Sequence, residues 1–382
     1  MSMANEVKNL SSEDNSNFFV RFLKYFIPWK GDNAAEIVRK IIFVFSIVLF
    51  AFSINELTDF LKTDQAELNY AQGIVKYEPN WDDGLELDGV DTGINGEGKK
   101  SDASETEDPS SNGQGIPKAT EKKSKERKVQ SWANDLLARN SDVVGWIKIP
   151  GFVNDSGDEY INFPVLQRKY DGDIDAGNDY YLRRDIDGNL YESGSIFVDC
   201  YIPIDEKGQP DNVVIYGHHM RRLGTSFTHL AEYKESVNMV KKHPMIEFNT
   251  IYDNNEKYVI IGCFVAAADD TQDDIEIFDY WRYRNFDKGD YSFDKWISNV
   301  RKQSWYSCDV ECTEDDDYIT LSTCSNEVAD MRWVIIAKKM TAKDNLDLIV
   351  ESYKERPDKD IYFPRVWRNV WGNSKKYLGW SY

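Results

Sequence analysis

One apolar block near the N-terminus limits how this chain can fold. The block IIFVFSIVLFAFSI runs from Ile41 to Ile54, and with its flanks, residues 37–57, it approaches the roughly 20 residues that cross a bilayer as a helix. Arg39 and Lys40 stand directly before it, acidic residues follow it, and no small-residue cleavage site of a signal peptide follows. The sequence therefore predicts a transmembrane helix at 37–57, with a buried core helix as the alternative.

The charges beside this block also predict its orientation. Basic residues next to a membrane span stay on the cytoplasmic side. We therefore expect residues 1–36 in the cytoplasm and the chain after residue 57 outside, in a single-pass protein of the cell membrane. The aromatic and basic segment FFVRFLKYFIPW, Phe18–Trp29, is either an interfacial helix or a short cytoplasmic helix.

A long polar stretch follows the apolar block. From about residue 82 to 127 the chain is rich in Gly, Ser, Asp, Glu and Lys and nearly free of large apolar residues. Such a segment cannot bury enough apolar surface to offset the entropy of ordering it. We expect an extracellular linker or stalk at 58–126 that holds a folded domain, residues 127–342, away from the membrane.

The folded domain is predicted to be mainly β. Eight runs rich in β-branched and aromatic residues are separated mostly by turn residues. These runs are VVGWIKIPG, INFPVLQ, SGSIFVDCYIP, NVVIYGHH, MIEFNT, EKYVIIGCFVAAA, DYITLSTC and RWVIIAKKM. One late helical pattern places Phe293, Trp296, Ile297 and Val300 on one face. Many strands with few helices indicate a β-barrel or sandwich with added helices.

Composition argues against two classes of function. With 46 Lys and Arg against 66 Asp and Glu, the net charge is -20, the opposite of a surface that binds nucleic-acid phosphates. The five cysteines and four histidines form no Cys-x-x-Cys or His-x-x-x-His pattern, so a zinc site has no support. The acidic runs 269–274 and 314–317 lack EF-hand spacing, and we interpret them as solvated surface.

Cys324 is the candidate nucleophile among the five cysteines. It ends the run DYITLSTC, where small neighbours leave room for a substrate. Cys200 and Cys263 lie inside strand-like runs, where a buried free thiol is the usual outcome. Cys308 and Cys312 lie in an acidic loop region, and a disulfide between them stays open. Because the thiolate is the reactive form, Cys324 needs an activating partner.

Two further residues complete a candidate catalytic set. His218 follows Gly217 at the end of NVVIYG, which places an imidazole at the rim of a sheet, and His219 is the second choice. Arg332 opens the strand eight residues after Cys324, and antiparallel neighbours joined by a short loop lie side by side. A guanidinium there can stabilise an oxyanion. A structural histidine and an exposed strand-end arginine are the alternatives.

This ordered set resembles the sortases, the cysteine transpeptidases of Gram-positive cell surfaces. The resemblance is carried by TLSTC with its downstream Arg and by VIYGHHM upstream, and it covers roughly residues 129–340. NDYYLRRDIDGNLYESGSIFVD, VVGWIKIPG, FPVLQ and the late helix before TLSTC are similar to class B. The resemblance implies the eight-stranded sortase β-barrel with added helices, in a catalytic domain at 127–342.

The resemblance also implies a reaction. Cys324 would attack the threonine carbonyl of a C-terminal sorting motif that ends in Thr-Gly or Thr-Asn, and form a thioacyl-enzyme. His218 would act as acid and base, and Arg332 would steady the oxyanion. The implied peptide-groove positions are Asn178, Leu182, Ser322 and Thr323. The implied partners are surface proteins carrying the motif and an amine of lipid II or of a peptidoglycan cross-bridge, with no metal or organic cofactor.

Other functions remain open at this point. A hydrolytic cysteine peptidase would use the same Cys–His pair, a pilin-polymerising sortase would use another acceptor amine, and an adhesin or scaffold would need no chemistry. Capture of the acyl group by an added amine distinguishes transfer from hydrolysis.

The aromatic C-terminal extension, residues 343–382, is not explained by the resemblance. Its last part carries Trp367, Trp371, Tyr377 and Trp380 with four cations among them. We expect it to pack across the barrel, because so much aromatic surface is costly to leave in water. Contact with anionic lipid is the alternative.

Overall fold

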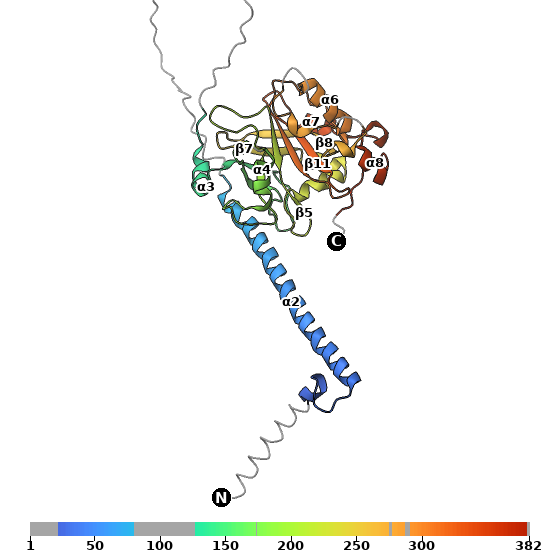
Figure 1. Cartoon of the computed structure of the whole chain (residues 1–382). Coiled ribbons are helices and arrows are strands. Elements are labelled where there is room, and N and C mark those ends of the chain that lie inside the picture. Colours follow the sequence, from blue (N-terminus) through green and yellow to red (C-terminus); the bar gives the residue numbers. More distant parts are fainter. Residues whose placement is uncertain (1–21, 80–126, 173, 275–276, 287–290, 380–382) are drawn as a thin grey trace, which may run out of the picture. The chain divides into compact units, whose positions relative to one another are not determined.

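The computed structural model describes residues 22–79, 127–172, 174–274, 277–286 and 291–379 (Figure 1). The chain divides into two compact units, Met1–Asn69 and Tyr70–Tyr382. Most of the expected linker, residues 80–126, lies outside the described residues.

A long helix dominates the first unit. Helix α2 runs from Ala34 to Ile74, and the 3-10 helix η1, Val75–Tyr77, continues it. Its apolar side chains between residues 38 and 61 are largely exposed. Within the described part of the chain it is the one helix long and apolar enough to cross a membrane. Residues 22–26, in the aromatic and basic segment, are helical as well.

The helix extends well beyond the end expected at residue 57. The expected linker therefore begins as helix, because the sequence TDFLKTDQAELNYAQGI is rich in the strong helix formers Leu, Lys, Gln, Glu and Ala. Residues from Tyr70 onward belong to the second unit, where Ile74 is buried. The Ile186 backbone N–H donates to the Tyr70 hydroxyl at 3.0 Å, and Glu78 pairs with Lys148 at 2.5 Å.

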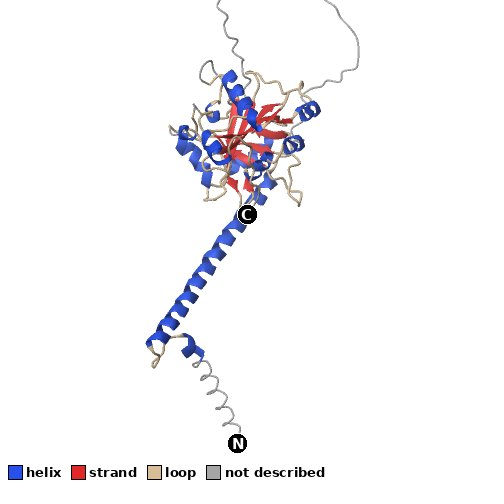
Figure 2. Cartoon of the chain, turned by 90° about the vertical axis from the view of Figure 1, so that its right-hand side faces the viewer, coloured by secondary structure: helices blue, strands red, loops and turns tan. Residues whose placement is uncertain are grey.

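Eight strands of the second unit close into a barrel in the order β1-β2-β3-β4-β10-β11-β8-β7. Figure 2 shows them at the centre of the domain with helices around them. The strands are β1 Val143–Lys148, β2 Asn162–Leu166, β3 Ile196–Val198, β4 Asn212–Tyr216, β7 Met245–Thr250, β8 Lys257–Ala266, β10 Tyr318–Cys324 and β11 Arg332–Lys339. Each lies in one of the eight predicted runs, so the predicted fold class is confirmed.

Helices and two small sheets surround the barrel, with α6, α7 and α8 on one side and α3 and α4 on the other (Figure 1). The α-helices are α3 Asn134–Arg139, α4 Ile174–Asp179, α5 Val237–Lys242, α6 Phe293–Gln303, α7 Leu346–Ser352 and α8 Arg365–Trp371. The 3-10 helices are η3 Ser131–Ala133, η4 Tyr180–Arg183, η5 Thr228–Lys234, η6 Asp270–Gln272, η7 Tyr280–Arg282 and η8 Asp358–Asp360. The small sheets pair β5 His219–Met220 with β6 Thr225–Ser226, and β9 Tyr306–Ser307 with β12 Lys354–Glu355. Helix α6 buries its predicted face.

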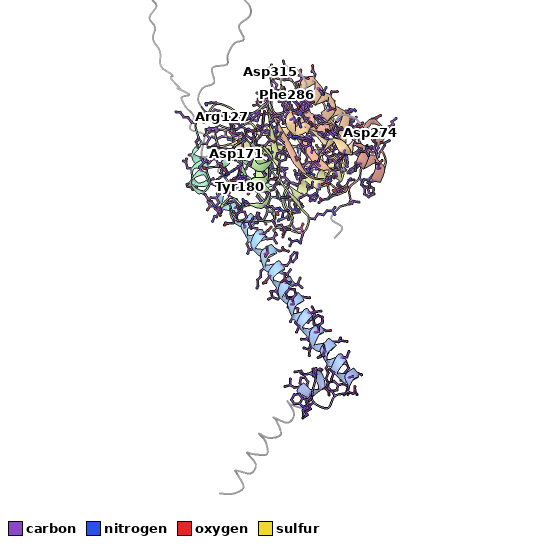
Figure 3. All side chains as sticks on the ribbon, viewed as in Figure 1. Arg127, Asp171, Tyr180, Asp274, Phe286 and Asp315 are labelled. Atoms are coloured by element: carbon purple, nitrogen blue, oxygen red, sulfur yellow. The ribbon has the colours of Figure 1, made fainter. Side chains whose placement is uncertain are left out.

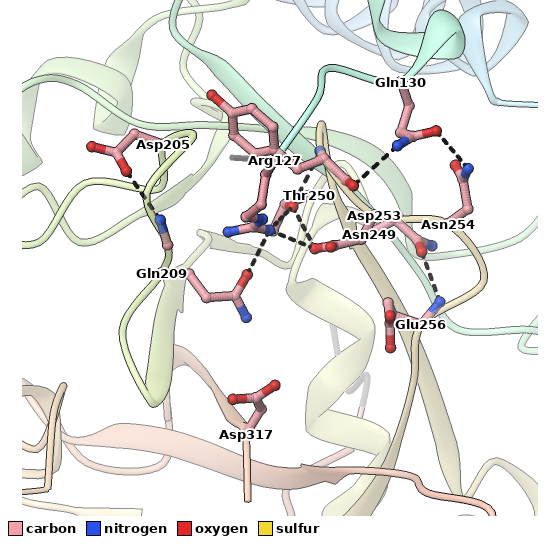
Figure 4. A network of polar contacts seen from close by, with 12 residues as sticks. Arg127, Gln130, Asp205, Gln209, Asn249, Thr250, Asp253, Asn254, Glu256 and Asp317 are labelled. Carbon is pink, nitrogen blue, oxygen red and sulfur yellow. Dashed lines mark hydrogen bonds and ion pairs between the residues drawn. The ribbon is translucent and has the colours of Figure 1, made fainter. Parts of the chain in front are cut away.

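The chain is held on the barrel from residue 127 onward. The Arg127 guanidinium donates to Thr250 Oγ1 at 2.7 Å, to Asp253 Oδ2 at 2.8 Å and to Gln209 Oε1 at 3.1 Å (Figure 4). Its backbone N–H donates to the Glu206 carbonyl at 3.1 Å. These bonds tie the start of the domain to the end of β7 and to the loop before β4.

The C-terminal extension packs on the barrel. Phe363 and Trp367 are fully buried in the main hydrophobic core, and Ile361 is nearly so. The Trp367 ring lies 6.1 Å from the ring of Trp305, which itself contacts Trp333 of β11. The expected packing across the barrel is confirmed for the described part of the extension.

Cations of the extension pair with the acidic run 269–274. Arg368 lies 2.6 Å from an Asp274 carboxylate oxygen and Arg365 lies 3.0 Å from the other, and the Tyr362 hydroxyl donates to Asp273 at 2.7 Å. Asp274 is labelled beside α8 in Figure 3. The interpretation of this run as solvated surface therefore holds for Asp269, Asp270 and Asp274, which are exposed. It does not hold for Asp273, whose partners in the extension lie about ninety residues away in sequence. Within the described chain no acidic cluster could hold a metal ion.

Deleting residues 360–382 is expected to lower the melting temperature of the full chain in detergent. Loss of a buried Phe or Trp costs about 3–5 kcal/mol. Each kcal/mol lowers the melting temperature of a domain of this size by about 2–4 °C, so we expect a drop of at least about 10 °C by differential scanning calorimetry. Deleting only 377–382 is the control, because it leaves Phe363 and Trp367 in place. An unchanged melting temperature with lost binding to anionic vesicles would favour the membrane alternative.

Candidate active site

Three adjacent strands bring the predicted catalytic residues to one end of the barrel. In the β10–β11 pair, Cys324 lies directly opposite Arg332, as the sequence predicted. On its other side β10 runs parallel to β4, with Ser322 opposite Tyr216. Because the two parallel strands end together, the chain that leaves β4 places His218 at the same end.

A cavity of about 960 Å³ opens at this end of the barrel. All seven residues predicted for the site line it, namely Asn178, Leu182, His218, Ser322, Thr323, Cys324 and Arg332. The wall also carries the aromatic side chains of Tyr216, Tyr280 and Trp281. Cys324, His218 and Arg332 are each half-buried, so they face the cavity with part of their surface open.

The imidazole of His218 is held by a backbone carbonyl. Its Nε2 lies 2.7 Å from the oxygen of Leu182. Since a carbonyl only accepts, Nε2 carries a proton, and Nδ1 is the nitrogen that can take up or release another. Burial lowers the pKa of His218, and the positive charges of Arg183 and Arg332 lower it further. The hydrogen bond to the Leu182 carbonyl acts in the opposite direction, but the net effect is a lowered pKa.

Two glycines allow this arrangement. A Cβ on Gly217 would lie 2.7 Å from the buried ring of Phe227, whose backbone N–H donates to the His218 carbonyl at 3.0 Å. Gly194 has a φ of +58°, and a Cβ there would collide with the carbonyl oxygen of Leu182, the one that His218 binds. Both positions therefore need glycine for His218 to keep its place.

His219 has a different environment from its neighbour. Its Nδ1 donates to the carbonyl of Cys324 at 3.0 Å, and it is not part of the cavity wall. Burial lowers its pKa to about 4, so it is neutral at neutral pH. His219 therefore supports the backbone of Cys324, whereas His218 faces the cavity.

Residues 175–340 match the sortase domain family. Sortase B of Staphylococcus aureus is 30% identical over 201 residues, which cover 52% of this chain and 70% of that protein. Sortase B of Listeria monocytogenes is 31% identical over 199 residues, covering 52% and 69%. The chain belongs to the class B sortases. This confirms the family expected from the sequence, and with it a cysteine transpeptidase.

Solved sortase B structures are similar as well. A crystal structure of sortase B from Staphylococcus aureus is 28% identical, covering 56% of this chain and 89% of that one with a TM-score of 0.45. Sortase B from Listeria monocytogenes is 28% identical, covering 54% and 98% with a TM-score of 0.41.

A buried ion pair of this sortase contacts the loop that directly follows the candidate nucleophile. Lys234 and Glu327 are 2.5 Å apart, and both side chains are almost completely buried. Lys234 also donates to the Ser325 carbonyl at 2.8 Å, and the Ser325 hydroxyl donates to Glu327 at 2.7 Å. This network holds the 325–331 loop, which joins Cys324 to Arg332. This network was not predicted from the sequence, because no local pattern pairs residues 93 positions apart.

A second buried pair forms part of the cavity wall of the sortase. Asp199 accepts from Arg284 at 2.7 and 2.9 Å, and from the Tyr216 hydroxyl and the Asn178 amide at 3.2 Å each. The Asn178 amide oxygen also accepts from the Cys200 backbone at 2.9 Å. Both the nitrogen and the oxygen of the Asn178 side-chain amide, a predicted groove residue, are thus hydrogen-bonded within the protein.

The other predicted groove residues flank the nucleophile or the base. Ser322 is buried, and its hydroxyl lies 2.7 Å from the hydroxyl of Tyr280. Thr323 is buried too, and its Oγ1 has no hydrogen-bond partner among the described residues. Leu182 is half-buried and bonds to His218 through its carbonyl.

None of the other four thiols lines the cavity in the described chain. All five cysteines are described and free, so the alternative of a Cys308–Cys312 disulfide is not realised here. Burial raises the pKa of Cys200 to about 11 and that of Cys312 to about 12, and it raises those of Cys263 and Cys308 as well. These four thiols are therefore protonated at neutral pH, the unreactive form.

Replacing Arg332 with glutamine is expected to raise the pKa of His218, because one of the positive charges that disfavour its imidazolium is lost. Titration of the His218 ring followed by NMR measures this. Glu192→Gln is the control of opposite sign, since Glu192 favours the charged ring and its loss should lower that pKa. A lowered or unchanged His218 pKa in Arg332→Gln would contradict the electrostatic account.

Proposed function

We propose that this sortase transfers a surface protein to an amine of a cell-wall precursor through a thioacyl-enzyme on Cys324. The observation that carries the proposal is the placement of Cys324, His218 and Arg332 on the wall of one cavity, at the ends of β4, β10 and β11. The substrate class is a protein with a C-terminal sorting motif that is cut after threonine.

In the first step the thiolate of Cys324, with His218 protonated, attacks the threonine carbonyl carbon. A carbon–sulfur bond forms, the amide carbon–nitrogen bond breaks, and His218 gives a proton to the leaving amine. In this proposal Arg332, which lies opposite Cys324 in the strand register, stabilises the oxygen that becomes negative. His218 can supply the proton through Nδ1 while Nε2 stays bound to Leu182.

In the second step an amine replaces the leaving group. His218 takes the proton of the incoming amine, the nitrogen bonds to the carbonyl carbon, and the carbon–sulfur bond breaks to restore Cys324. We propose lipid II or a peptidoglycan cross-bridge as the source of this amine. The two steps use side chains of this chain and require no metal or organic cofactor. Asn178, Leu182, Ser322 and Thr323 border the peptide in this proposal.

We propose that α2 anchors the enzyme in the cell membrane with the N-terminus in the cytoplasm and the catalytic domain outside. The exposed apolar side chains of α2 and the basic residues before its apolar block support this. That location would place the cavity where surface proteins and wall precursors meet.

A transfer assay tests the proposed function. The full chain in detergent is incubated with a library of sorting-motif peptides and a short amine, and the products are identified by mass. We expect peptides cut after threonine and joined to the amine in larger amount than the hydrolysed acid. A product that is all hydrolysed acid would favour the peptidase alternative, and no cleavage of any peptide would contradict both.

A further inference from the structure

The C-terminal extension reaches the loop that connects the proposed nucleophile to the proposed oxyanion stabiliser. The Trp371 indole N–H donates to the backbone carbonyl of Glu327 at 3.3 Å. Glu327 lies in the 325–331 loop, whose two ends lead to Cys324 and to Arg332. The extension lies outside residues 175–340, the part of the chain that matches the sortase domain.

The 325–331 loop is also held by a buried ion pair, in addition to this contact with the extension. The Glu327 side chain is held by Lys234, while its carbonyl faces the extension. The ring of Trp371 packs against the main core, and the Lys376 ammonium lies 5.1 Å from the centre of that ring. The loop is therefore held on one side by the barrel and on the other by the extension.

The extension also touches the segment that carries His218. Arg221 follows His218 by three residues, and its guanidinium approaches the Gly379 carbonyl at 3.4 Å. Earlier in the extension, Arg365 and Arg368 of α8 pair with Asp274, which precedes the cavity residues Tyr280 and Trp281 in the chain. Three segments that frame the cavity thus each contact the same extension.

We propose that the C-terminal extension is a positioning element of the active site, in which Trp371 holds the 325–331 loop and the chain near Gly379 holds the segment after His218. The extension keeps Cys324, Arg332 and His218 in register with one another without touching substrate. This inference rests on the proposed roles of those three residues, and it assigns Trp371 as a positioning residue.

Trp371→Phe tests the proposal in the full chain in detergent. The variant keeps an aromatic ring but removes the donor to the Glu327 carbonyl. We expect kcat to fall roughly fivefold, the effect of losing one neutral hydrogen bond, with KM near the wild-type value. Alkylation of Cys324 by iodoacetamide, followed by the mass of its peptide, should speed up because the loop opens more often. The melting temperature should change little.

Arg356→Gln is the matched control within the extension. Arg356 donates to the Arg301 carbonyl at 2.6 Å and to the Ser304 carbonyl at 2.5 Å, at the end of α6. Its loss should lower the melting temperature while leaving kcat and Cys324 alkylation at 25 °C unchanged. If Trp371 positions the loop, Trp371→Phe should lower kcat and raise the rate of Cys324 alkylation, and Arg356→Gln should change neither. General destabilisation would affect both variants.

A chain that ends after Lys376 provides the second test, since it removes Gly379 but keeps Trp371. We expect a lower kcat and a shifted pH dependence of kcat in this variant. If both variants keep wild-type kcat and alkylation, the inference is overturned while the proposed function stands. If the wild type transfers no peptide, the proposed function fails, and alkylation of Cys324 still decides whether Trp371 holds the loop.

Discussion

Replacing Cys324 with alanine is expected to abolish transpeptidation and to leave the melting temperature near that of the wild type. Cys324 ends β10 and is half-buried, so loss of its sulfur opens no cavity in the closed core. No other thiol lines the cavity of the described chain. Loss of a catalytic nucleophile lowers kcat by roughly a millionfold in a well-studied serine protease, and we expect a loss of that order here.

The control for this variant is Cys200→Ala. Cys200 is buried outside the cavity wall, and burial raises its pKa to about 11, so its thiol stays protonated. Its removal should leave transfer of the sorting-motif peptide largely intact. Amine-dependent product formation, quantified by mass, distinguishes the two variants. Wild-type turnover in Cys324→Ala would refute the assignment of the nucleophile.

Some of the site could be predicted from the sequence because the geometry is local. Cys324 and Arg332 are eight residues apart in two runs joined by a short loop, and antiparallel pairing then places them opposite each other. The eight strands were predictable for a similar reason, since each carries β-branched and aromatic residues between turn residues. The buried face of α6 follows from its helical period.

Other parts depend on contacts that no local pattern reveals. The presence of His218 in the same cavity wall as Cys324 requires the parallel pairing of β4 with β10, about a hundred residues away in sequence. The Lys234–Glu327 and Asp199–Arg284 pairs look in the sequence like ordinary surface charges, yet each is buried by elements distant along the chain. The ion pairs of the acidic run at 269–274 could not be predicted either, because their arginines are supplied by α8.

Replacing His218 with alanine is expected to lower kcat by about 100- to 10,000-fold, the usual contribution of acid–base catalysis. His218 faces the cavity, and its Nε2 bond to Leu182 orients the ring with Nδ1 left for proton transfer. Its lowered pKa reduces the fraction of imidazolium at neutral pH but makes that imidazolium a stronger acid toward the leaving amine.

His219→Ala is the neighbouring comparison, and its cost should be at most about tenfold, because it removes one neutral hydrogen bond to the Cys324 carbonyl. With a pKa of about 4, His219 is almost entirely neutral at neutral pH, so hardly any imidazolium is present to act as an acid, and the residue lies outside the cavity wall. The measurement is kcat for peptide transfer in both variants, with melting temperatures to confirm folding. A larger loss of kcat in His219→Ala than in His218→Ala would show that His219, and not His218, is the acid and base that acts with Cys324.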